Sequence, residues 1–224
     1  MNITILGTGN MGTAFAQQLH AAGHALQIVG RDPVKARALA DRFGASEERA
    51  QAASSDLIVL ATAYDDAIRA LGDAALPAGA VVVDITNPLT SDYMGLTLGH
   101  SSSAAEQISA AFPGVHVVKA FNTVFAQRLA AGAQAGNGQI VPVFVAADDA
   151  QAKARVSEMA RSMGFDVIDA GPLRNARYLE PLAGLNIYLG YGAGLGTAIA
   201  PTWLRQSSGV RHQPRQVHVF VEAS

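Results

Sequence analysis

The opening of the chain constrains the fold more than any other stretch. Apolar Ile3, Ile5 and Leu6 predict a short buried strand that runs directly into Gly-Thr-Gly-Asn-Met-Gly at residues 7–12. A helix is predicted to follow, from Met11 to Leu19. A G-x-G-x-x-G sequence between a strand and a helix is typical of a turn that holds the phosphates of a dinucleotide.

The three glycines of this turn have separate physical roles. Gly7 permits the tight turn, Gly9 lets the backbone approach a pyrophosphate, and Gly12 lets the helix pack closely on the strand. The free N–H groups and the positive end of the helix dipole would face the phosphates. An isolated glycine motif is weak evidence, but the flanking strand and helix favour dinucleotide binding.

Strand and helix patterns then alternate, which predicts β-α-β units and a parallel sheet. A capping box formed by Ser101–Ser103 and Glu106 indicates where one helix begins. Further strands are predicted at Ala25–Val29, near Ala45, and at Asp56–Thr62, Ala80–Thr86, His116–Phe121, Val141–Ala146 and Phe165–Ala170. Helices are predicted at 33–44, 47–53, 64–71, 101–112, 122–130 and 148–163. The fold class is therefore α/β, a Rossmann-like doubly wound parallel sheet with a C-terminal helical cap.

The end of the second predicted strand favours NADP over NAD. In this type of fold an acidic residue about twenty positions beyond the glycines binds the ribose 2′-hydroxyl of NAD, whereas an arginine accommodates the 2′-phosphate of NADP. Here Gly30 stands in the acidic position and Arg31, which can hold a phosphate through two hydrogen bonds, follows it. Thr8 and Lys35 are expected to add contacts. Asp32 is interpreted as the N-cap of the next helix.

The chain divides into three predicted parts. Residues 1–172 form the NADP-binding Rossmann domain, and residues 173–205 form a helical cap or dimer segment because the stretch from Asn175 to Trp203 is helical in pattern and rich in glycine. Residues 206–224 form a tail with an alternating segment at Val217–Val221. We expect the cap to cover the active site or to form the surface of a homodimer.

Composition excludes several classes of function. The 224 residues include no cysteine and carry a formal net charge of −2, which excludes disulfides and cysteine-ligated metals and argues against a nucleic-acid partner. The apolar stretch at 179–200 is interrupted by Pro181 and several glycines, so no membrane span is expected. No secretory signal is visible, and the six histidines predict no metal site. The expectation is a cytoplasmic protein.

Loops at the carboxyl ends of later strands should border the nicotinamide half of the cofactor. One loop contains Ala61, Thr62 and Ala63, followed by Tyr64, which could stack on a ring or simply pack in the fold. The next loop is Thr-Asn-Pro at residues 86–88.

Two polar residues stand near the end of the strand predicted at 116–121. Asn122 has both a donor and an acceptor with which to hold an amide or a ring carbonyl. Lys119 is either a catalytic acid or a salt-bridged lysine of the strand, and the second interpretation is favoured.

The chain resembles the NADPH-dependent coenzyme F420 reductases (F420H2:NADP oxidoreductases) over about residues 2–203. It is also similar to the cytoplasmic NADPH domain of the STEAP metalloreductases, which pass electrons through flavin to ferric or cupric ions. The features that carry both resemblances are the glycine turn, Arg31, the segments 86–88 and 101–106, and above all Lys-Ala-Phe-Asn-Thr at 119–123 and Ala-Gly-Pro-Leu-Arg-Asn-Ala-Arg at 170–177 with Glu180.

The resemblance implies roles for individual residues. Thr8, Asn10 and Met11 join the glycines at the pyrophosphate, and Arg31 with Thr8 faces the 2′-phosphate. The path from adenosine to nicotinamide is lined by Ala61, Thr62, Asn87 and Pro88, with Ala120 and Asn122 beside the ring. Gly30, Asp32 and Asn122 depart from the archaeal F420 enzymes, in which serine, arginine and histidine are typical, and this leaves the acceptor open.

The expected function is hydride transfer between NADP(H) and a small-molecule redox acceptor, either a deazaflavin (F420) or a flavin (FMN or FAD). Stacked rings need no acid–base pair, so no catalytic side chain is predicted and Asn87 and Asn122 are expected to position the rings. One alternative is a STEAP-like flavin-mediated ferric reductase. Another is an NADPH-binding sensor or regulatory protein without turnover. A small-substrate dehydrogenase is disfavoured because no catalytic lysine or histidine is convincingly placed.

Overall fold

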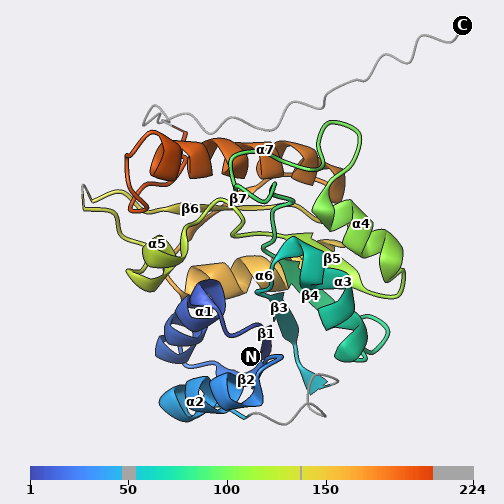
Figure 1. The fold of residues 1–224 in the computed structure, drawn as a ribbon. Coiled ribbons are helices and arrows are strands. Elements are labelled where there is room, and N and C mark those ends of the chain that lie inside the picture. Colours follow the sequence, from blue (N-terminus) through green and yellow to red (C-terminus); the bar gives the residue numbers. More distant parts are fainter. Residues whose placement is uncertain (47–53, 137, 204–224) are drawn as a thin grey trace, which may run out of the picture.

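A computed structural model describes residues 1–46, 54–136 and 138–203 of the chain. Its main sheet is parallel, with the strand order β2-β1-β3-β4-β5 (Figure 1). These strands are β1 (Asn2–Leu6), β2 (Ala25–Val29), β3 (Leu57–Leu60), β4 (Val81–Asp84) and β5 (His116–Lys119). A second, two-stranded parallel sheet consists of β6 (Pro142–Val145) and β7 (Asp166–Asp169). The predicted α/β class with a parallel sheet is confirmed.

Helices cover both faces of the main sheet and its upper end (Figure 1). Alternate residues of one strand belong to different cores: Val81 and Val83 of β4 pack in one cluster, and Val82 packs in the other. This alternation is the result of burying both faces of a parallel sheet. The helices are α1 (Asn10–Ala21), α2 (Pro33–Phe43), α3 (Tyr64–Asp73), α4 (Ala104–Ala111), α5 (Ala126–Ala130), α6 (Ala150–Ser162), the 3₁₀ turn η2 (Leu173–Asn175), α7 (Ala176–Ile187) and the π-helical turn η3 (Tyr188–Gly192).

Two predicted helix caps are present. The carboxylate of Asp32 accepts hydrogen bonds from the backbone N–H groups of Val34 (3.0 Å) and Lys35 (3.2 Å) at the start of α2. At the start of α4, the hydroxyl of Ser103 accepts from the N–H of Glu106 (3.2 Å) and donates to its carboxylate (2.7 Å). These local bonds satisfy backbone donors that the first helical turn leaves unpaired, and they fix where α2 and α4 begin.

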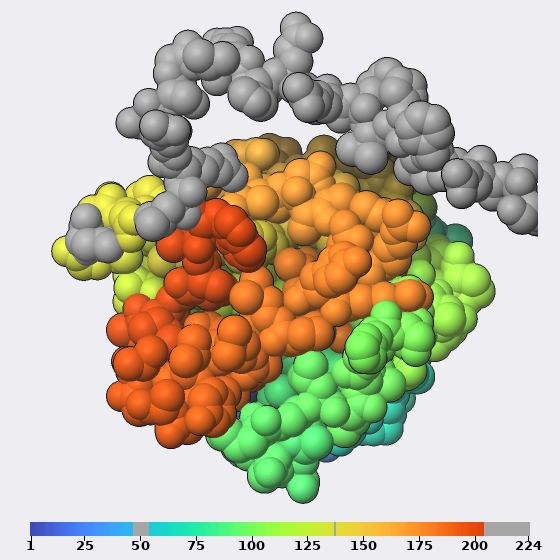
Figure 2. Space-filling view, turned by 90° about the horizontal axis from the view of Figure 1, so that it is seen from above, coloured from blue at the N-terminus to red at the C-terminus, as the bar shows by residue number. Residues whose placement is uncertain are grey.

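The cap at the C-terminal end lies over the upper end of the sheet. Figure 2 shows α7, in orange, beside the green segment that contains the loop after β4. A Cβ atom on Gly184 of α7 would lie 3.5 Å from the side chain of Leu96, in ordinary contact with this loop. The cap therefore packs on segments that are distant from it in the sequence.

Several predicted elements differ from the structure. The strand near Ala45 is reduced to a single bridge between Gln27 and Ser46, and the helix predicted from residue 122 begins at Ala126. The long C-terminal helix ends in η3, because residues 193–203 are not helical. The helix predicted at 47–53 and the tail at 206–224 lie outside the described residues. Within the described ranges, no helix is long and apolar enough to cross a membrane.

Candidate functional site

The glycine turn between β1 and α1 has the predicted geometry. Gly7 has a φ angle of +127°, and a Cβ atom there would lie 2.3 Å from the carbonyl oxygen of Ala61. A Cβ atom on Gly12 would lie 2.0 Å from the carbonyl oxygen of Gly7. A Cβ atom on Gly9 would have no atom of the structure within 4 Å. Packing of the turn therefore requires Gly7 and Gly12, whereas the space beside Gly9 is open to a ligand.

A cavity of about 330 Å³ lies between this turn, the end of β2 and α3; we call it the first cavity. A Cβ atom on Gly30, in its wall, would lie 2.7 Å from a methyl carbon of Thr8. The hydroxyl of Thr62 is buried there with no hydrogen-bond partner among the described residues. The predicted residues that line the first cavity are Gly7, Thr8, Gly9, Arg31, Lys35, Ala61, Thr62 and Ala63.

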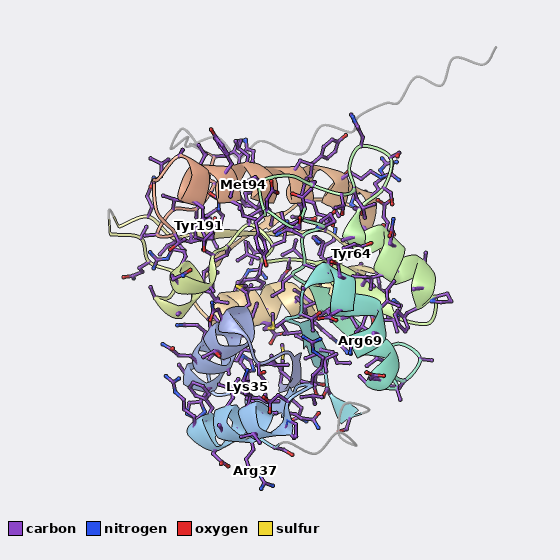
Figure 3. The ribbon with its side chains drawn as sticks, in the orientation of Figure 1. Lys35, Arg37, Tyr64, Arg69, Met94 and Tyr191 are labelled. Carbon is purple, nitrogen blue, oxygen red and sulfur yellow. The ribbon has the colours of Figure 1, made fainter. Side chains whose placement is uncertain are left out.

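Charged residues of α3 also line the first cavity, and the sequence analysis missed them. A nitrogen of the Arg31 guanidinium lies 3.2 Å from the carboxylate of Asp66, which also pairs with Arg69. Arg69 lies 3.9 Å from Asp73 as well. Figure 3 shows Arg69 on α3 and Lys35 on α2. Residues 66, 69, 70 and 73 share one face of α3 by their helical spacing, which could have revealed them once this helix was placed beside the turn.

A second cavity, of about 670 Å³, lies on the other side of the turn, and Asn10 and Met11 line it. Its walls come from the loop after β4, the segment after β5 and α7 with η3. Asn87 and Asn122 line it as well. The residues that sequence reasoning missed include Asp92, Tyr93, Met94, Phe125, Gln127, Asn186 and Tyr191. Gly12, Pro88 and Ala120 line neither cavity; Pro88 and Ala120 are buried in the fold beneath.

Asn87 and Asn122 form a hydrogen-bonded pair in the second cavity. The side-chain N–H₂ of Asn122 donates to the side-chain oxygen of Asn87 (3.0 Å) and to the carbonyl oxygen of Leu179 (2.8 Å), while Asn87 donates to the carbonyl oxygen of Asn122 (2.9 Å). The side-chain oxygen of Asn122 is buried and has no partner among the described residues. Asn122 follows Phe121, whose φ of +60° is uncommon for a bulky residue. Since both N–H groups are engaged, Asn122 can offer a ligand only an acceptor.

Beneath the second cavity, Lys119 forms a buried ionic cluster. Its ammonium lies 2.9 Å from Asp84 and 2.7 Å from Glu180, and it donates to the carbonyl oxygen of Thr86 at 2.5 Å. All three charged side chains are at most 2% exposed. Glu180 also accepts from the N–H of Ala104, the first residue of α4 (2.9 Å). The favoured interpretation of Lys119 as a salt-bridged lysine is therefore confirmed.

Two further contacts attach α4 to its neighbours. The hydroxyl of Tyr64 donates to the side chain of Gln107 at 2.5 Å, and Tyr64 lines neither cavity, which favours its interpretation as a packing residue. Burial raises the pKa of this hydroxyl above its ordinary value. Arg177 of α7 holds Glu106 with bonds of 2.6 and 2.9 Å, and this partner lowers the pKa of Glu106. Arg177 thereby fastens the cap to α4.

The two cavities share the glycine turn, so one extended ligand with phosphates at its centre could occupy both. The sequence matches the family described as NADP oxidoreductase, coenzyme F420-dependent, over residues 2–88. A structure of a candidate F420-dependent NADP-reductase from Arthrobacter sp. FB24 is 32% identical in sequence, with a TM-score of 0.79 over 91% of this chain and 99% of that one. The chain belongs to this family.

Other proteins that are similar to this chain are not named as F420-dependent reductases. Metalloreductase STEAP3 of Rattus norvegicus is 33% identical over 181 residues, which are 80% of this chain and 36% of the relative. The chain thus spans about a third of the length of the curated relatives it matches. The hypothetical protein SMa0349 of Sinorhizobium meliloti is 29% identical, with a TM-score of 0.70 over 77% of this chain and 86% of that one.

The chain shares the family and fold of NADP-dependent oxidoreductases, and the residues present fit the cofactor. The first cavity offers cationic side chains for a 2′-phosphate, of which Arg31 and Lys35 were predicted. The open space beside Gly9 suits the pyrophosphate, and the unpartnered oxygen of Asn122 suits an N–H donor such as a carboxamide. The fit thus extends over both cavities.

Proposed function

We propose that the protein transfers hydride between NADP(H), which extends from the first cavity into the second, and a flavin or deazaflavin ring in the rest of the second cavity. The observation that carries the proposal is the side-chain oxygen of Asn122, which is buried without a hydrogen-bond partner among the described residues, on a residue that lines a large cavity next to the glycine turn. A buried acceptor without a partner costs free energy, about 1–3 kcal/mol, unless a ligand supplies a donor.

The pair of asparagines explains how a ring would be oriented. Asn87 and Leu179 fix both N–H groups of Asn122, so its side-chain oxygen cannot exchange places with its nitrogen. That oxygen accepts the carboxamide N–H of a nicotinamide, and this bond selects one orientation of the ring. Aromatic and thioether side chains, including Tyr93, Met94 and Tyr191, also line this cavity and are exposed in the single chain, so they offer apolar surface that a bound ring would cover.

The chemistry requires position more than proton transfer by side chains. When bound, NADPH supplies a hydride that the acceptor ring takes at N5 of a flavin, or C5 of a deazaflavin, with a proton from solvent, which leaves NADP⁺. The ionisable residues among those described in the wall of the second cavity are Asp92, Tyr93 and Tyr191. Lys119 cannot serve as an acid, since Asp84 and Glu180 hold its ammonium out of contact with solvent.

A second candidate is a flavin-mediated ferric reductase, which the identity of 33% to metalloreductase STEAP3 supports. In that case a flavin in the second cavity would carry electrons from NADPH to ferric ions, and NADPH would bind at the same site. A third candidate is an NADPH-binding sensor without turnover.

One panel of assays separates these functions. Anaerobic NADPH oxidation is followed by its absorbance with riboflavin, FMN or F420, each with and without ferric citrate, and repeated with NADH. Consumption of NADPH with a ring acceptor alone is the expected result. Turnover only when flavin and iron are both present would indicate the ferric reductase. Tight NADPH binding without oxidation by any acceptor would contradict the proposal and favour a sensor.

The role of Asn122 is tested by substitution. Asn122→Ala should lower kcat/KM for NADPH oxidation about tenfold, as expected when a buried hydrogen bond of about 1.4 kcal/mol is lost in the reacting complex. Asn186→Ala is the matched control, since Asn186 lines the same cavity but donates to the backbone oxygen of Thr123. Equal losses in both variants would mean that Asn122 has only a structural role.

A homodimer stays a prediction, and we propose that the cap forms its surface. Several large hydrophobic side chains of this region are exposed in the single chain, namely Tyr178, Leu185, Tyr188, Leu195 and Trp203. Apolar side chains gathered in one region favour association. Sedimentation of the protein at micromolar concentration should give the mass of a dimer, and a monomer would contradict the proposal.

A further inference from the structure

The walls of the two cavities differ in charge. Three cationic side chains, Arg31, Lys35 and Arg69, line the first cavity, and three carboxylates of the same wall, Asp32, Asp66 and Asp73, pair with them. Among the described residues that line the second cavity there is no lysine, arginine or histidine, and the one charged side chain is the carboxylate of Asp92. A ligand that spans both cavities therefore meets cations paired with carboxylates at one end and, at the other, a carboxylate without a cationic residue among those described in the same wall.

Asp92 is held in place by its own loop. The hydroxyl of Thr90 donates to the Asp92 carboxylate at 2.5 Å, and the backbone N–H of Met94 donates to the same oxygen at 3.0 Å. Both bonds favour the ionised form and lower the pKa of Asp92. The second cavity thus has a fixed negative charge at neutral pH.

The rest of this wall suits an uncharged planar molecule. Phe125 and Tyr191 contact each other edge to face, with ring centroids 5.6 Å apart, and Met94 and Tyr93 lie on the loop that carries Asp92. Figure 3 shows Met94 and Tyr191 in the upper part of the molecule, away from Lys35 and Arg69. Aromatic and thioether groups with a few amides bind a ring and its hydrogen-bonding edge, but they offer no partner to a phosphate.

We propose that the acceptor of this protein is an uncharged ring compound of the riboflavin type, and that Asp92 selects against acceptors with an anionic chain such as FMN or F420. The proposal rests on the proposed function and specifies its acceptor. Riboflavin and FMN form a sharp test because they share one ring and one reaction and differ by a terminal phosphate. A difference between them therefore reports on the charge of the site.

The experiment compares KM values for riboflavin and FMN at saturating NADPH and low ionic strength. The wild-type protein should show a KM for FMN about threefold above that for riboflavin, since a unit charge acts weakly across water, and added salt should remove the difference. Asp92→Asn keeps the acceptor oxygen for Thr90 and Met94 and should bring the two KM values together. Asp92→Lys should reverse their order.

Asp41→Asn is the matched control, because Asp41 is an exposed carboxylate on α2 that lines neither cavity. It changes the net charge equally and should leave the ratio of KM values as in the wild type. A lower KM for FMN or F420 than for riboflavin in the wild type would overturn the inference alone, as would equal ratios in the two asparagine variants. Absence of turnover with all three acceptors would instead overturn the proposed function.

Discussion

The two cavities on either side of the glycine turn are built in different ways. The first is lined by residues 6–74 of the first three β-α units, and ion pairs hold its cationic side chains in place. The second joins segments from residue 10 to residue 191, and its walls are mostly aromatic, aliphatic and amide groups, with the single carboxylate of Asp92 among the residues described there. Under the proposed function, affinity for the 2′-phosphate end of the cofactor thus depends on local sequence and charge, whereas the acceptor site depends on how distant segments pack.

The largest expected effect tests this dependence at the buried cluster beneath the second cavity. Lys119→Met leaves the carboxylates of Asp84 and Glu180 without their cation, and we expect a loss of about 3–5 kcal/mol of unfolding free energy. Urea denaturation measures it. Lys153→Met is the control: its partner Asp169 is 67% exposed, so about 0.5 kcal/mol is expected. Similar losses in both variants would show that burial of the cluster contributes nothing.

The next effect separates folding of the turn from ligand binding. Gly12→Ala places a methyl group against the carbonyl oxygen of Gly7 and should cost about 3 kcal/mol of stability. Gly9→Ala meets no atom of the protein, so its stability should stay near that of the wild type while NADPH affinity falls about tenfold through loss of close backbone approach to the pyrophosphate. Thermal unfolding and fluorescence titration distinguish the two. Unchanged NADPH affinity in Gly9→Ala would place the pyrophosphate elsewhere.

A third pair of variants addresses the first cavity alone. Arg31→Ala should weaken NADPH binding about thirtyfold, from loss of a charge-assisted bond of about 2 kcal/mol, with little change for NADH. Asp66→Asn should strengthen NADPH binding about threefold, because Asp66 competes with the 2′-phosphate for Arg31. Titration calorimetry measures both. A wild-type preference for NADH would contradict the assignment of Arg31.

The smallest effect concerns the attachment of the cap to α4. Arg177 lowers the folded-state pKa of Glu106, so this pair stabilises the protein fully above the ordinary glutamate value of 4.5, and the contribution is lost as pH falls through the lowered folded value. We expect Arg177→Met to be slightly less stable than wild type at pH 7, with the gap closing in acid. Denaturant titrations across this pH range measure the gap. A gap that persists at the lowest pH would point to packing instead of charge.

Sequence reasoning reached the first cavity more completely than the second for a physical reason. Glycine sterics, strand–helix order and Arg31 are local signals, and the structure places those residues in one wall. The second cavity depends on contacts between distant segments, such as the hydrogen bond from Asn122 to the carbonyl oxygen of Leu179, 57 positions away. The hydrophobic periodicity of a sequence does not predict such contacts. Asn122 was predicted as both donor and acceptor, but its donors are engaged within the fold.

Sequence patterns also failed to predict some of the secondary structure and the role of some helix residues. The π-helical turn and the irregular stretch after Gly192 replace a predicted helix, since Gly194 and Gly196 have φ angles of +74° and +77°, which end a helix and which a helical apolar pattern does not predict. Asp66 and Arg69 resembled an ordinary helix surface, and only the position of α3 beside the turn places them at a cavity.

The two cavities are lined by different parts of the sequence, and this has an evolutionary consequence. Every residue that lines the first cavity lies within residues 2–88, the stretch that matches the family, whereas most of the second cavity is lined by residues beyond 88. Under the proposed function, substitutions in the loop after β4 or in α7 would change the electron acceptor while the nucleotide half is inherited intact. A lineage with this architecture would then diversify its chemistry by altering one wall, in accord with relatives named both as F420-dependent reductase and as metalloreductase.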